Sequence, residues 1–67
     1  MTTVWLNDDQ RDVPAGTTVA ALMDAHGVPE RGVAVAVDGT VVPRASWATT
    51  ALLDGSHVEV LTAVQGG

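Results

Sequence analysis

Apolar and polar residues alternate near the start of the chain in the pattern of a β-hairpin. Over residues 3–7, Val4 and Leu6 fall on one face, which is the two-residue period of a half-buried strand. Residues 8–9 are both Asp and favour a turn, because an Asp side chain can hydrogen-bond to the backbone near it. We therefore expect residues 11–13 to form a short returning strand.

A short amphipathic helix is expected after this hairpin. Thr17 or Thr18 can cap its start with a side-chain hydroxyl, and Gly27 can adopt the left-handed conformation that ends it. A helix of about nine residues does not persist alone in water, so we expect it to pack on a sheet. Four residues spaced at i, i+3, i+4 and i+7 would share one face of it: Val19, Leu22, Met23 and His26. His26 is also expected to close the C-terminus of the helix, where a partial positive charge is favourable.

A second hairpin is predicted in the middle of the chain. Residues 33–37 alternate Val and Ala, so both faces of this segment are apolar. Such a strand is expected to be covered on both sides or to lie centrally in the sheet. Asp38-Gly39 strongly favours a two-residue turn, because both positions tolerate a positive φ, and residues 40–42 would then pair back.

The last third of the chain is predicted to be a connector, a strand and a tail. Residues 44–56 show no period and are expected to be irregular, with Trp47 filling one end of the core. Alternation resumes over residues 57–64, which predicts the final strand. The element order favours the α+β class and the β-grasp fold, a mixed sheet of about five strands packed on one main helix. We expect this domain to span residues 1–64 and residues 65–67 to be a flexible tail.

Composition limits what this domain can do. The chain has 67 residues and no Cys, which excludes disulfides and thiolate metal sites. Its formal net charge of −5, from eight acidic residues and three Arg, argues against nucleic acid as a partner. The acidic surface fits either a basic protein partner or a requirement for solubility. Without a targeting segment or an apolar run near ~20 residues, we expect no membrane association and a cytoplasmic location.

The residues suggest no internal catalytic site. His26 and His57 are the only imidazoles, and no spacing of possible ligands indicates a metal site. The paired carboxylates of residues 8–9 are better explained by the turn. The C-terminus is different, since Gln65 leads into Gly66-Gly67, a stalk without further side chains that ends in a carboxylate. Extended, three residues reach about 10 Å, and glycine allows such a stalk to enter a narrow channel.

Several stretches together carry a family pattern. They are residues 15–19 with Leu22, 33–39, 42–44, 46–48, 54–55, 58–60 and 66–67. In this pattern, which covers nearly the whole chain, the sequence resembles ThiS, the sulfur-carrier family of the thiamine pathway. Val-Pro-Arg at residues 42–44 and Trp47 are the most diagnostic elements. At two turn positions the chain departs from the family, with Asp38 where Asn is more common and Ser56 where Asp is common.

The resemblance implies a carrier rather than an enzyme. An E1-like adenylyltransferase would use ATP to adenylate the carboxylate of Gly67, which would then become a thiocarboxylate. Thiazole synthase would receive the sulfur. Gln65 and Gly66 would form the stalk, and the chain itself would hold no cofactor, no metal and no catalytic residue.

An outward-facing apolar patch is the expected docking surface. In a β-grasp sheet the first and last strands lie side by side. The alternate residues of these two strands are expected to face the helix: Val4, Leu6, Val58 and Val60. In that case Trp5, Leu61 and Ala63 face outward together. Exposed apolar patches of this kind are typical of protein interaction sites. The alternatives are that residues 44–56 or a second copy of the chain cover the patch.

Three other functions share parts of this pattern. A sibling β-grasp carrier would deliver sulfur to molybdopterin or another sulfur-containing metabolite through the same tail. A ubiquitin-like protein modifier would begin with the same adenylate and end in an isopeptide bond. An RNA-binding or regulatory β-grasp module would need no tail chemistry, and the net charge of −5 disfavours the RNA-binding form.

Overall fold

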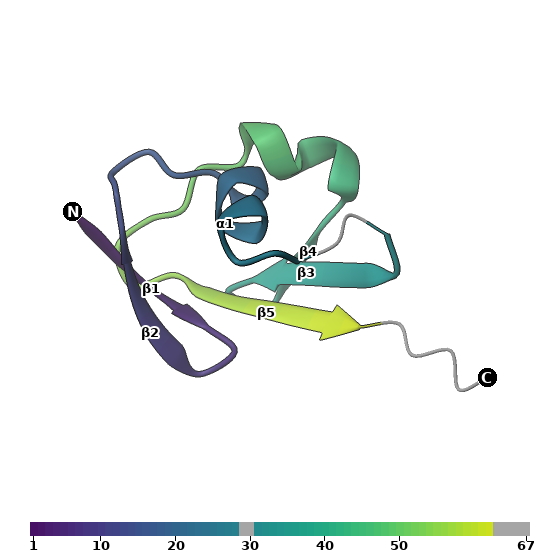
Figure 1. Ribbon diagram of the computed structural model, residues 1–67, viewed down its shortest axis with the longest axis horizontal. Helices are drawn as coiled ribbons and strands as arrows, with labels where there is room; N and C mark the ends of the chain where they lie inside the picture. The colour runs from purple at the N-terminus through teal and green to yellow at the C-terminus, as the bar shows by residue number, and fades with distance from the viewer. Residues whose placement is uncertain (29–30, 63–67) are drawn as a thin grey trace.

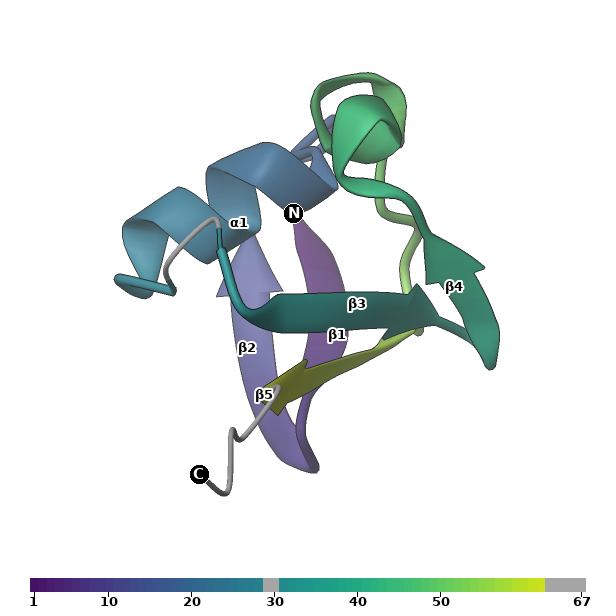
Figure 2. The same cartoon turned by 90° about the vertical axis from the view of Figure 1, so that its right-hand side faces the viewer.

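The computed structural model describes residues 1–28 and 31–62 of the chain (Figure 1). Within these ranges, five strands form one sheet, and an α-helix and a 3-10 helix lie together on one side of it (Figure 2). In chain order the elements are β1 (Thr2–Leu6), β2 (Asp9–Val13), α1 (Val19–Ala25), β3 (Val33–Val37), β4 (Thr40–Val42), η1 (Arg44–Thr49) and β5 (His57–Thr62).

The strand order across the sheet is β2-β1-β5-β3-β4. Strands β1 and β5 pair in parallel, whereas the other three pairs are antiparallel, so the sheet is mixed as predicted. A parallel pair needs a crossover connection, and the helical layer with β3 and β4 supplies it. The first and last strands therefore lie side by side at the centre of the sheet, and β3 is an internal strand.

The two hairpin turns place non-glycine residues at positive φ. Asn7 (φ 48°) and Asp8 (φ 72°) join β1 to β2. The expected turn at residues 8–9 was therefore one position late, since Asp9 already pairs with Leu6 in the ladder. Asn and Asp tolerate a positive φ better than most residues, so both Asn7-Asp8 and Asp8-Asp9 are plausible turn positions. The turn at Asp38 (φ 51°) and Gly39 lies where the sequence predicts it.

Helix α1 begins as predicted and ends earlier than its apolar spacing suggests. The Thr18 hydroxyl accepts a hydrogen bond from the Ala21 N–H at 3.2 Å, which caps the first turn. Val19, Leu22 and Met23 are buried, but His26 is exposed. His26 is the C-cap, with φ −103° and ψ 10°, which confirms that it closes the C-terminus of the helix. Because it has left the helical period, it does not share the buried face.

The connector is not wholly irregular, which corrects the expectation for residues 44–56. Arg44–Thr49 form a 3-10 helix, and the Ser46 N–H donates to the Pro43 carbonyl at 2.8 Å. A helix this short carries no readable apolar period. Trp47 fills the core as predicted, being 5% exposed, and its Nε1–H donates to the Val42 carbonyl at 3.0 Å. The helical layer is thereby tied to the end of β4.

Candidate docking face and C-terminal strand

The second face of the sheet carries no helix in the described part of the chain. In both views α1 and η1 lie on the same side, and the opposite side of the strands is uncovered (Figures 1 and 2). We call this surface the open face. It presents the residues that alternate with the core positions: Thr3, Trp5, Gln10, Asp12, Ala34, Ala36, Val41, His57, Glu59 and Leu61.

Trp5 and His57 form an aromatic pair at the middle of the open face. The parallel register of β1 and β5 puts these residues directly opposite each other. Their ring centroids are 5.9 Å apart, and the ring planes differ by 8°, so the rings are stacked. Trp5 is half-buried, while His57 is exposed. Sequence reasoning did not connect His57 with Trp5, because the register of two strands so far apart in the chain has no local signal.

Leu61 extends this apolar surface along β5 towards the C-terminus. It is 62% exposed and lies opposite the exposed Ala34 of β3. The structure thus places Trp5 and Leu61 on the same face, and Ala63 lies outside the described residues. The connector does not cover them, because η1 packs beside α1 on the other side of the sheet.

Side chains from two turns fix the position of β5. Asn7 brackets Val60, since its Oδ1 accepts from the Val60 N–H at 2.8 Å and its Nδ2 donates to the Val60 carbonyl at 3.5 Å. At the start of the strand, Asp38 Oδ1 accepts from the His57 N–H at 2.9 Å. The Asp38 N–H in turn donates to the His57 carbonyl at 2.8 Å. The role of Asn7 was missed, although an Asn in a turn is a known source of such side-chain bonds.

A shallow pocket of about 460 Å³ opens on the open face around the aromatic pair. Its position is set by the two hairpin turns and the start of β5. No group of three or more potential ligands in the described residues could hold a metal ion. The residues that line the pocket are Trp5, Asp8, Asp38, Gly39, His57, Val58 and Glu59.

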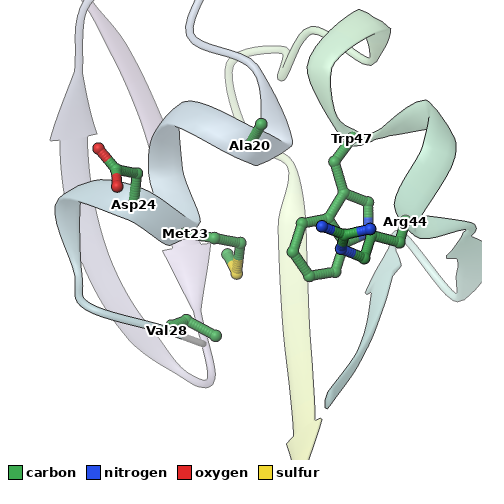
Figure 3. A pocket seen from close by; sticks show the side chains of 6 residues that line it. All are labelled: Ala20, Met23, Asp24, Val28, Arg44 and Trp47. Carbon is green, nitrogen blue, oxygen red and sulfur yellow. The ribbon is translucent and has the colours of Figure 1, made fainter. Parts of the chain in front are cut away.

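A second pocket, of about 210 Å³, lies on the covered side between α1 and η1 (Figure 3). Met23 points from α1 towards Trp47 of η1, and both side chains belong to the buried core. Asp24 and Arg44 are the charged residues of its lining. The pocket is therefore the seam between two packed elements, with no nucleophile or imidazole in its wall.

The tail residues Gln65, Gly66 and Gly67 lie outside the described residues, as do Ala63 and Val64. The described structure ends with β5 at Thr62, which pairs with Val33 of β3. No helix in the described ranges is long and apolar enough to cross a membrane.

Known proteins similar to this chain share both its sequence and its fold. The model of the ThiS family matches residues 4–67. The chain is 30% identical to the sulfur carrier protein ThiS of Escherichia coli (strain K12) over 64 residues, which cover 96% of this chain and 97% of that protein. The crystal structure of the thiamine biosynthesis protein (ThiS) from Geobacter metallireducens superposes with a TM-score of 0.83 at 28% identity, covering 98% of this chain and 100% of that one. This likeness confirms the β-grasp prediction.

A longer relative contains a region similar to this chain. Over 62 residues, 92% of this chain, the sequence is 37% identical to the thiazole synthase of Paramagnetospirillum magneticum (strain ATCC 700264 / AMB-1). The chain spans 19% of the length of that thiazole synthase, so the match concerns one part of the larger protein.

Proposed function

Because the chain belongs to the ThiS family of sulfur carriers for thiamine biosynthesis, we propose that the carboxylate of Gly67 is the group that carries the sulfur. The family consists of carrier proteins rather than enzymes, so the catalysis belongs to its partners. The observation that supports this proposal most strongly is the match of the family model through residue 67, the terminal glycine itself.

The chemistry of a carboxylate explains why such a carrier needs an ATP-dependent partner. A free carboxylate is anionic and has no good leaving group, so a sulfur nucleophile does not attack it. An E1-like adenylyltransferase would join the Gly67 carboxylate to AMP and release pyrophosphate. A sulfide-level donor would then displace AMP and leave a thiocarboxylate. This dependence on ATP supports a cytoplasmic site of action, and the carrier itself would bind no cofactor.

Thiazole synthase is the proposed acceptor of the sulfur. The thiazole synthase from Paramagnetospirillum magneticum contains a region 37% identical to this chain, and proteins joined in one chain commonly act together. A thiocarboxylate is a soft nucleophile that survives transfer between two enzymes. Gln65 and Gly66 would allow it to enter an active site too narrow for a stalk with larger side chains.

We propose that the open face is the surface on which the adenylating enzyme docks. Trp5 and Leu61 expose apolar area there, and no described element covers it. Ala63 would extend the same surface towards the tail. A partner bound to this face would hold the body while the tail leaves β5 in the direction of the partner's active site. A few residues near the centre of an interface carry most of the binding energy, and Trp is enriched among them.

The carrier proposal is tested by reconstitution. The full chain, the adenylating enzyme, ATP and a sulfide donor are combined, and the intact mass of the carrier is measured. We expect a gain equal to the replacement of one oxygen by sulfur. A chain ending at Gly66 should show no gain while keeping the same thermal unfolding midpoint. Equal thiocarboxylation of the two chains would contradict the assignment to Gly67.

A further inference from the structure

The pocket on the open face is lined by an aromatic pair and by three acidic residues. The stacked rings of Trp5 and His57 lie within it. Three acidic residues from different elements line the same pocket: Asp8 from the β1–β2 turn, Asp38 from the β3–β4 turn and Glu59 from β5. None of the described residues that line the pocket is Arg or Lys. The pocket therefore concentrates negative charge next to exposed aromatic surface.

Two of the three carboxylates are available to a partner. The side-chain carboxylates of Asp8 and Glu59 form no hydrogen bond or ion pair with any described residue. Asp38 is different, because its Oδ1 accepts the His57 N–H and holds the start of β5. On the far side of the sheet, Arg11 contacts Asp9 at 3.8 Å, so this arginine does not neutralise the pocket. The carboxylates of Asp8 and Glu59 therefore make no stabilising contact within the described fold.

A metal ion does not fit this arrangement. A bound cation would need several ligands converging on one point, and no such group exists in the described residues. A guanidinium group matches better, because its five N–H donors spread in a plane and can reach carboxylates on different elements. Its planar face also stacks on aromatic rings, which extends the Trp5–His57 pair rather than disrupting it.

We propose that this pocket receives a cationic side chain of the adenylating enzyme, best matched by arginine, which stacks on the Trp5–His57 pair and contacts Asp8 and Glu59. This inference rests on the proposed function, since it names the chemistry that the partner presents to the open face. The contact with Leu61 would supply apolar burial, and the pocket would supply charge complementarity and orientation.

A near-isosteric pair of substitutions tests the pocket. In the double variant Asp8→Asn/Glu59→Gln, both charges are removed, and Asn tolerates the positive φ at residue 8. We expect the Kd for the purified adenylating enzyme at low salt to rise about tenfold. Because charge pairs are screened by ions, added NaCl should weaken the wild type more than the double variant.

The matched control removes two charges elsewhere. Asp9 and Asp24 are exposed and do not line this pocket, so Asp9→Asn/Asp24→Asn changes the net charge equally. We expect a Kd within about twofold of the wild type, since this variant alters long-range attraction and the exposed Arg11–Asp9 ion pair but no charge in the pocket. If binding to the adenylating enzyme weakens equally in the two double variants, or in neither, the pocket is not the site of a cationic side chain. That result would leave the carrier function intact. If the wild type is not thiocarboxylated in a parallel reaction, the proposed function itself is wrong, and this inference fails with it.

Discussion

At the scale of single residues, Trp47 shows what a sequence can and cannot reveal. Its size among small neighbours predicted that it fills the core, and it is buried. The hydrogen bond from its Nε1–H to the Val42 carbonyl could not be predicted, because it depends on how η1 folds back over β4. Asp38-Gly39 was located because its turn is local, whereas the bonds from Asn7 to Val60 join residues far apart in the chain.

Replacing Trp47 by Phe tests the contribution of this residue to stability. The substitution removes the hydrogen bond and leaves a cavity beside the Val42 carbonyl, so we expect the free energy of unfolding to fall by about 2–4 kcal/mol. Urea denaturation followed by circular dichroism measures the change. Leu53 is 72% exposed, and Leu53→Ala should cost less than about 1 kcal/mol. Similar losses in the two variants would show that Trp47 is not a core residue.

At the scale of secondary structure, periodicity located β1, β3 and β5, and turn signals located β2 and β4. The ends of elements and the 3-10 helix were less predictable. The strands β3 and β4 have the bounds expected from the sequence. Helix α1 has seven residues, and its end could not be read from apolar spacing because His26 fits the period but leaves the helix. Such a short helix depends on its cap and on the sheet beneath it.

The N-cap of α1 gives a direct test at this scale. Thr18→Ala removes the acceptor for the Ala21 N–H, and we expect a loss of about 1 kcal/mol in the free energy of unfolding. Thr18→Ser keeps the hydroxyl and should stay within about 0.5 kcal/mol of the wild type. Chemical denaturation of the three proteins under the same conditions measures both values. An alanine variant as stable as the serine variant would mean that the cap contributes nothing.

At the scale of the whole molecule, one layer of helices on one side of the sheet leaves the other side open for a partner. The order of elements predicted this architecture, and the family resemblance predicted that β1 and β5 are neighbours. The register that stacks Trp5 on His57, and the pocket around the stack, depend on the placement of the turns. The chemistry assigned to Gly67 comes from the sequence and the family, since the tail lies outside the described residues.

Leu61→Asp tests the open face as a docking surface. Leu61 is 62% exposed, so the substitution should leave the fold and its unfolding midpoint nearly unchanged. We expect the Kd for the adenylating enzyme to rise by about tenfold or more, because a charge would replace apolar contact area. Leu53 is 72% exposed and lies between η1 and β5, outside the sheet, so Leu53→Asp is the control. If the Leu61 variant binds the adenylating enzyme with unchanged affinity, the open face is not the docking surface.

The central claim is that this small domain carries sulfur on its last residue. The most direct measurement is the intact mass of the chain isolated from cells starved of thiamine. We predict a species heavier by the exchange of one oxygen for sulfur, and its absence from a chain that lacks Gly67. A thiocarboxylate mass that persists without Gly67, or normal thiazole formation supported by that shortened chain, would contradict the claim.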